Sequence, residues 1–365
     1  MSPTTAFEAL APVSPVPLAP VAPAIAALGL AVAADFAFGE PPRHVHPVAW
    51  FGSLVGRIDR EWHRPRLVGV AVAVALPLAA AAALGLLVAV AAVYGPWETG
   101  YGPLPAEMSV LAPLVAGGVL FVAASGRMLL DVTSEVVSLT ETDPEAARES
   151  VRALVGRDPS ALSPAALRSA AVESAAENLA DGFVAPLWWF AVGTTAGVVA
   201  GAVGTPADAG SATPVIALSL GVAAAVWVKA VNTLDSMLGY RSKPVGSASA
   251  RLDDLAMYLP ARASAGCLAV AAIAVGGAPL GVLRRARSWA REPASPNSGW
   301  PMAVGAAALD VRLEKPGNYA LNPTVDPPTA ADAERAVRLV GAAGGVAVAA
   351  AVGWLLALAG VTAWL

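Results

Sequence analysis

Long apolar segments are the feature of this sequence that most limits its fold. Each is close to the roughly 20 residues that an α-helix needs to cross a bilayer. They lie at 19–38, 67–94, 108–124, 183–203, 212–230, 263–282 and 339–365. Only 14% of the residues are charged, against about a quarter in an ordinary soluble domain. We therefore predict an all-α fold, a polytopic integral membrane helical bundle in a lipid bilayer.

The basic residues predict which helix ends face the cytoplasm. The connections 95–107 and 204–211 are acidic or neutral. All 23 Lys and Arg residues lie in four other blocks, at 39–66, 125–182, 229–262 and 283–338. Basic loops stay cytoplasmic by the positive-inside rule. We expect a multi-pass protein of the cell membrane whose functional loops are cytoplasmic.

The segment 263–282 does not fit a simple alternation of crossings. If it crossed, the next block, which carries Arg284, Arg285, Arg287 and Arg291, would be exported. A Gly-Gly pair and a proline also interrupt its C-terminal half. We expect a re-entrant hairpin or a buried helix, which is tolerated where protein covers the backbone. The count is then six or seven spans.

The chain is expected to form one helical domain, 19–365, after a disordered, proline-rich leader at 1–18. The functional loops of that domain are expected at 39–66, 125–182, 231–262 and 283–338. One cysteine and three histidines cannot build a disulfide framework, a cysteine zinc site or a histidine-rich metal centre. The net charge of -4 argues against nucleic acid as a partner.

Three carboxylates stand four residues apart in the stretch ESAAENLADG. Ser163 is a suitable N-cap for the helix that carries them, and Gly182 suits its end. Side chains four apart share one helix face, so Glu173, Glu177 and Asp181 line up. Like charges at this spacing destabilise a helix unless a cation, a metal or solvent compensates them. The alternative interpretation is a solvated polar face on a cytoplasmic helix.

Two further stretches place polar groups at the ends of apolar helices. In WVKAVNTLDSMLGYRSKP, Lys229, Asn232 and Asp235 are about three residues apart and share a face. Such groups at the mouth of a membrane helix are functional candidates, although Lys229 and Arg241 could also reach the interface simply by snorkelling.

The stretch SARLDDLAMYLPAR carries the adjacent pair Asp253 and Asp254 between two arginines. Mg²⁺ prefers carboxylate oxygens, usually one or two together with substrate phosphates. Acidic residues near the start of a helix are the alternative explanation. Walker A, Rossmann, zinc-protease and serine-hydrolase motifs are absent from the sequence.

In their order and spacing, these stretches resemble the adenosylcobinamide-phosphate synthase family of cobalamin biosynthesis, called CbiB or CobD. The resemblance runs from about residue 30 to 325. It is carried by FGEPPRHVHPVAWFG at 38–52, ESAAENLADGFVAPLWW at 173–189, KAVNTLDSMLGYRS at 229–242, ASARLDDLAMYLPAR at 248–262, SPNSGWPMA at 295–303 and VRLEKPGNY at 311–319.

The resemblance implies an ATP-dependent acid–amine ligase embedded in the membrane. The enzyme would join the propionate carboxylate of adenosylcobyric acid, a corrinoid substrate, to the amine of (R)-1-amino-2-propanol or of its O-phosphate. The carboxylate must be activated, most simply as an acyl phosphate. Mg²⁺ would neutralise the phosphates during transfer and basic side chains would clamp them.

The resemblance also suggests roles for the polar residues. The carboxylates expected to receive the ammonium or take its proton are Glu173, Glu177 and Asp181. Those expected to hold Mg²⁺ are Asp253 and Asp254, with help from Asp235, which is also a catalytic candidate. The candidates for binding substrate or phosphate are Arg43, His46, Asn178, Lys229, Asn232, Arg241, Ser242, Arg251 and Asn297. Among these, Lys229, Arg241 and Arg251 would contact phosphate, and Asn178, Asn232 and Asn297 would orient corrinoid amides.

An ion-coupled membrane transporter is the competing interpretation, because such carriers use intramembrane carboxylates and broken helices. The polar residues crowd the cytoplasmic helix ends rather than the middle of the spans, which favours an active site at the membrane surface. A non-catalytic scaffold would leave the clustered polar residues unexplained. Analogy would also allow association with other late cobalamin enzymes, and a homo-oligomer stays open.

Overall fold

The computed structural model describes residues 18–94, 108–154, 158–204, 212–240 and 242–362. Six helical runs in these ranges are long and apolar enough to cross a membrane. They are Pro65–Tyr94, Leu111–Thr142, Pro164–Val203, Ala212–Leu238, Tyr258–Val275 and Ala330–Thr362. The predicted polytopic helical fold is thereby confirmed. The predicted leader falls almost wholly on residues 1–17, which lie outside the described ranges.

The six runs contain these elements: α3 (Pro65–Tyr94), α4 (Leu111–Ala123), α5 (Gly126–Thr142), α7 (Pro164–Leu179), the π-helix η2 (Ala180–Val184), α8 (Ala185–Gly204), α9 (Ala212–Leu238), α11 (Tyr258–Ala271), the 3₁₀-helix η4 (Ala272–Val275) and α14 (Ala330–Thr362). The shorter elements are α1 (Ala22–Phe38), η1 (Arg43–Val45), α2 (Pro47–Gly56), α6 (Pro144–Val151), η3 (Pro244–Gly246), α10 (Ser247–Ala256), α12 (Pro279–Ala286), α13 (Gly299–Leu309), β1 (Leu313–Lys315) and β2 (Tyr319–Leu321).

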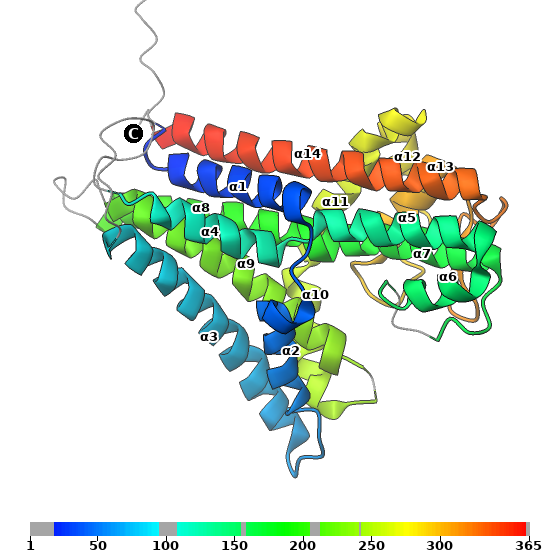
Figure 1. Cartoon of the computed structure of the whole chain (residues 1–365), viewed down its shortest axis with the longest axis horizontal. Coiled ribbons are helices and arrows are strands. Elements are labelled where there is room, and N and C mark those ends of the chain that lie inside the picture. Colours follow the sequence, from blue (N-terminus) through cyan, green and yellow to red (C-terminus); the bar gives the residue numbers. More distant parts are fainter. Residues whose placement is uncertain (1–17, 95–107, 155–157, 205–211, 241, 363–365) are drawn as a thin grey trace, which may run out of the picture.

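The helices form one elongated body with two different ends (Figure 1). At one end α1, α4, α8, α9 and the C-terminal part of α14 run together, and α3 leaves them at an angle. At the other end α5, α6 and α7 continue beyond them, and α14 packs against both halves. The helix ends that flank 95–107 and 205–211 lie away from α6 and α12. This separation matches the charge pattern, while the cytoplasmic orientation stays a prediction.

Two of the expected spans differ from the observed helices. The first, 19–38, becomes α1, whose 17 residues are fewer than those of the six long runs. The sixth expected segment, 263–282, is interrupted as its Gly-Gly pair suggested. The helical run ends at Gly276, which adopts a left-handed φ of 82°, and α12 begins at Pro279. The prediction that this segment is re-entrant or buried, and does not cross the bilayer, stays a prediction.

The prediction that Gly182 ends its helix is wrong. Residues 164–204 form a continuous helical run, in which η2 joins α7 to α8. The carbonyl of Gly182 accepts a hydrogen bond from the backbone N–H of Ser125, at 3.1 Å between nitrogen and oxygen. A π-helical turn closes its hydrogen bonds over five residues and so accommodates an extra residue without breaking the helix.

A short hairpin and a short helix in the block 283–338 were not predicted. The strands β1 and β2 pair antiparallel as a hairpin, with Lys315 directly opposite Tyr319. Three-residue strands are too short to show a clear alternation of apolar and polar residues. All residues of the helix α13 except Trp300 are buried, so it lacks the polar face that reveals an amphipathic helix in a sequence.

A row of glycines brings α8 and α9 into close contact. Gly193, Gly197 and Gly201 recur every fourth residue along α8. A Cβ atom at Gly197 would lie 2.5 Å from the Cα of Ala217, and one at Gly193 would lie 2.3 Å from the carbonyl oxygen of Leu220. Small residues at this spacing allow membrane helices to pack backbone against backbone. The helices α8 and α9 therefore pack closely along this row of glycines.

We expect Gly197→Leu to destabilise the protein by about 3 kcal/mol or more, because the new side chain must push α8 off the backbone of α9. Thermal unfolding in detergent measures the effect. Gly353→Leu is the matched control, since a Cβ atom at Gly353 meets nothing within 4 Å. Equal melting temperatures for the two variants would contradict the close packing.

Candidate active site

The carboxylate face of α7 is buried against the hairpin. Ser163 caps the helix as predicted, because its Oγ accepts a hydrogen bond from the N–H of Ala166. Glu173 is only 5% exposed, and its Oε1 accepts a hydrogen bond of 2.8 Å from the Tyr319 hydroxyl. Glu177 interacts electrostatically with Glu173 and with Lys315. The interpretation of this face as solvated is therefore wrong for Glu173.

These side chains line a polar pocket of about 440 Å³. Its walls come from α7, from the β1–β2 hairpin and from the segment 292–298 before α13. Its charged and hydroxyl-bearing lining residues are Glu173, Ser174, Glu177, Tyr240, Glu292, Ser295, Ser298, Lys315 and Tyr319. Three carboxylates and one ammonium give the pocket an excess of negative charge. A small ligand with an ammonium group at one end and an anionic group at the other matches this lining.

A second acidic cluster adjoins the pocket. Asp181 in η2 interacts electrostatically with Glu177, Lys229, Asp235 and Asp253. Asp235 in turn interacts with Asp254. The cluster thus joins η2, α9 and α10, and Glu177 links it to the polar pocket.

Hydrogen bonds fix α10 against the membrane helices. The Asn232 side chain donates to the Asp253 carboxylate, as their positions on neighbouring helices allow. Trp189 Nε1 of α8 donates to the carbonyl of Ala256 at 3.1 Å, and its ring packs edge to face against Trp227 of α9. The acidic residues of α10 are therefore held at a defined place beside α9.

The environment of α10 resists ionisation of its acids. Burial and the nearby Asp235 carboxylate raise the pKa of Asp253 to about 7. Burial also raises the pKa of Asp254. Asp253 Oδ1 is buried and has no hydrogen-bond partner within the described part of the chain. A carboxylate oxygen in this state is suited to receive a cation.

The acidic cluster fits a magnesium ion that arrives with phosphate. In the described residues, no group of three or more His, Cys, Asp or Glu side chains is arranged to hold a metal by itself. Mg²⁺ does not require such a cage, because it commonly takes one or two carboxylates and completes its shell with water and substrate phosphates. Asp253, Asp254 and Asp235 are the residues that could supply such carboxylates.

Both clusters lie within a region that matches a known family. The family model described as CobD/Cbib protein matches residues 28–340. The chain belongs to the CobD/CbiB family. It is 37% identical over 317 residues to the cobalamin biosynthesis protein CobD of Mycobacterium tuberculosis (strain H37Rv), covering 84% of this chain and 87% of the relative.

Other CobD proteins show the same level of similarity. The cobalamin biosynthesis protein CobD of Rhodobacter capsulatus is 37% identical over 85% of this chain and 90% of its own length. That of Klebsiella pneumoniae is 32% identical over 89% of this chain and 96% of its own length. No solved structure matches the chain significantly. The family and these relatives assign the chain to cobalamin biosynthesis.

In this CobD/CbiB protein, the loop after α1 reaches the acidic cluster through Glu40. His46 caps α2, since its Nδ1 accepts the N–H of Val48, and its Nε2 lies 3.1 Å from Glu40 Oε1. Nδ1 is thus the nitrogen that caps the helix, and Nε2 is the one that lies beside Glu40. Glu40 also interacts electrostatically with Lys229. His46 thus lies next to this carboxylate, and its predicted contact with substrate stays a prediction.

Asn297 holds the segment before α13 against α10. It is 5% exposed, its Nδ2 donates to the carbonyl of Asp254 at 2.8 Å, and its Oδ1 accepts from Arg262 at 2.9 Å. The Arg262 guanidinium also lies over the Tyr258 ring. Both ends of the Asn297 amide are therefore used by protein groups, and its predicted role toward corrinoid amides stays a prediction.

The remaining predicted binding residues that the structure describes are more accessible than Asn297 and His46. Arg43, Ser242 and Arg251 are exposed, and Asn178 is partly buried on α7. Arg241 lies outside the described residues.

The structure adds Lys315, Tyr319 and Glu40, which the sequence did not single out. A Pro-Gly turn within VRLEKPGNY was the available signal for the hairpin that carries Lys315 and Tyr319.

Proposed function

We propose that this protein is an adenosylcobinamide-phosphate synthase, an ATP-dependent ligase. It would join the propionate carboxylate of adenosylcobyric acid to (R)-1-amino-2-propanol or to its O-phosphate. The observation that carries the proposal is the polar pocket, which Glu173, Glu177 and Lys315 line together, with Lys315 interacting electrostatically with Glu177. An amino alcohol phosphate carries an ammonium, which would pair with the two glutamates, and a phosphate, which would pair with Lys315. The adjoining cluster of Asp235, Asp253 and Asp254 suits a magnesium-bound nucleotide.

The pocket residues account for the amine half of the reaction. At neutral pH the substrate amine is an ammonium ion, which Glu173 and Glu177 attract and orient. The ammonium must lose a proton before it can attack a carbonyl carbon, and Glu177 would accept that proton. Lys315 would hold the phosphate of the phosphorylated amine. Positioned proton transfer of this kind contributes about 10²–10⁴-fold to a rate.

The acidic cluster accounts for the phosphate half. In the proposed sequence a corrinoid carboxylate oxygen attacks the γ-phosphate of ATP, which gives an acyl phosphate and ADP. The amine then attacks the acyl carbon, and inorganic phosphate leaves. Asp253, Asp254 and Asp235 would hold Mg²⁺, which supplies charge neutralisation when bound. Lys229 adds a positive charge beside Asp181. The exposed Arg251 would contact the nucleotide.

Direct assay of the purified protein in liposomes tests the proposal. Adenosylcobyric acid, Mg-ATP and either amine are supplied, and the amide product and ADP are quantified by mass spectrometry. We expect one amide and one ADP per turnover. Absence of product with both amines from folded protein would exclude the ligase, and ion-coupled flux across the same liposomes would then test the transporter interpretation.

We expect Lys315→Met to separate the two candidate amines. Loss of a charge-assisted hydrogen bond to phosphate costs about 1.5–3 kcal/mol, so KM for the phosphorylated amine should rise about 10–100-fold. KM for the unphosphorylated amine should change little. Arg338→Met, at an exposed position of α14, is the control. Equal KM changes for the two amines would remove Lys315 from the phosphate subsite.

A further inference from the structure

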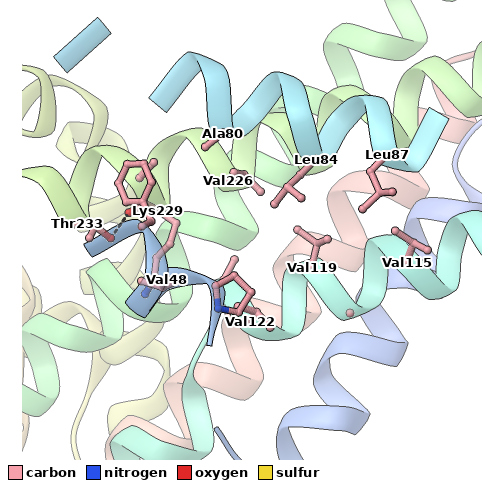
Figure 2. A pocket seen from close by; sticks show the side chains of 15 residues that line it. Val48, Ala80, Leu84, Leu87, Val115, Val119, Val122, Val226, Lys229 and Thr233 are labelled. Atoms are coloured by element: carbon pink, nitrogen blue, oxygen red, sulfur yellow. Dashed lines mark hydrogen bonds between the residues drawn. The ribbon is translucent and has the colours of Figure 1, made fainter. Parts of the chain in front are cut away.

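A second pocket, of about 360 Å³, lies among the membrane helices and is almost wholly apolar. Figure 2 shows Leu84 and Leu87 of α3 facing Val115 and Val119 of α4, with Val226 of α9 beside them. All three helices belong to runs long and apolar enough to cross a membrane. The pocket is therefore placed at the depth of the hydrocarbon rather than in water.

One end of this pocket is polar. Lys229 lies there, and Figure 2 shows its side chain extending from α9 toward the start of α2 at Val48. The Thr233 hydroxyl, also at this end, donates to the Lys229 carbonyl. Leu87 and Val115 lie at the opposite end of the view. The pocket thus combines a long apolar channel with a cation at one end, which is the polarity of a membrane lipid.

We propose that this pocket holds one acyl chain of a phospholipid, with the polar end of that lipid near Lys229. The charged groups of the proposed ligase's substrates would find no partners along this apolar lining. An acyl chain matches the lining and could enter it from the bilayer. The lining on α4 runs from Val115 to Ala123, and eight helical residues span about 12 Å. That length is close to one leaflet, which is half of a hydrocarbon core of about 30 Å.

Gly118 gives a direct way to test this site. It lines the pocket, and a Cβ atom there would meet nothing within 4 Å. Gly118→Leu therefore fills the channel without a clash at its Cβ. Gly353→Leu on α14 is the matched control, because its Cβ is equally unobstructed but lies outside the pocket lining.

The measurement is native mass spectrometry of protein extracted from vesicles of phosphatidylethanolamine and phosphatidylglycerol. We expect the native protein and Gly353→Leu to retain one phospholipid, and Gly118→Leu to lose it by about tenfold or more, a change of at least 1.4 kcal/mol. Equal retention by all three proteins, or no retention by the native protein, would overturn the proposal.

A photoreactive phospholipid supplies a test that does not depend on the variant's folding. Crosslinks from a diazirine in its acyl chain to the native protein should concentrate on Leu84, Val119 and Val226. Crosslinks spread evenly over exposed helix residues such as Leu67 and Val361 would mean that the acyl chain has no specific site, and would also overturn the proposal.

Discussion

Replacing Asp253 by asparagine is expected to abolish amide synthesis while stabilising the unliganded protein at pH 8. Asp253 is one of the carboxylates that would hold the Mg²⁺ that neutralises the reacting phosphates, so its loss should lower kcat by about 100-fold or more. The stability of the fold should instead increase, because burial and the neighbouring Asp235 carboxylate make the Asp253 side chain costly to ionise. Product formation and thermal unfolding in a chelator measure the two effects.

The pH dependence of that stability gain follows from the raised pKa of about 7. The folded protein binds the Asp253 proton more tightly than the unfolded chain does, so this proton stabilises the fold below about pH 4. The contribution is lost as the pH rises through 7. At pH 8 the ionised side chain costs on the order of a few kcal/mol, which asparagine avoids. The advantage of Asp253→Asn should therefore shrink between pH 8 and pH 5.

Asp158→Asn is the control for this titration. Hydrogen bonds from Ser160 lower the pKa of this exposed acid, so its removal should bring no gain at pH 8. A stability gain for Asp253→Asn that is the same at pH 5 and pH 8 would show that burial of the charge is not its cause. Full activity of the variant would remove Asp253 from the site.

Glu177→Gln is expected to have the second large effect, a loss of about 10²–10⁴-fold in kcat with either amine. Glutamine keeps the shape of the side chain but cannot accept the ammonium proton, and Glu177 links the polar pocket to Asp181. Tyr319→Phe, which removes the hydrogen bond to Glu173, should cost only about tenfold. Steady-state kinetics at several pH values measure both variants.

Glu334→Gln, at an exposed position of α14, is the matched control for loss of a glutamate. If Glu177→Gln raised KM for the amine and left kcat unchanged, Glu177 would bind the ammonium without acting as its base. If neither constant changed while the variant remained folded, the polar pocket would not be the amine site.

Local spacing predicted much of the polar site. The interval of four residues placed Glu173 and Glu177 on one face, and both line the pocket. The interval of three placed Asn232 and Asp235 on one face of α9, and in the structure both interact with Asp253. These relations depend on one helix turn, so a sequence contains them directly. The separation of the basic blocks from the acidic or neutral connections could also be predicted, because it depends on the bilayer and not on contacts between residues.

Contacts between distant segments could not be predicted in the same way. Tyr319 reaches Glu173 across 146 residues, and Asn297 reaches the Asp254 carbonyl across 43. Both depend on how α13 and the hairpin pack, and α13 is too short and too uniformly apolar to be recognised. The expected end of α7 at Gly182 failed for a related reason, because η2 keeps the helix continuous where a glycine favours an end.

The π-helix η2 has a geometric consequence for the whole rod from α7 to α8. One face of this rod must carry Glu173 and Glu177 to the pocket, and another must carry Gly193 and Gly197 to α9. Each residue of an α-helix turns the chain by about 100°. Deleting one residue from η2 would therefore rotate the two faces out of phase by roughly that angle. The π turn therefore sets the angle, around one continuous helix, between the face that carries the polar pocket residues and the face that packs on α9.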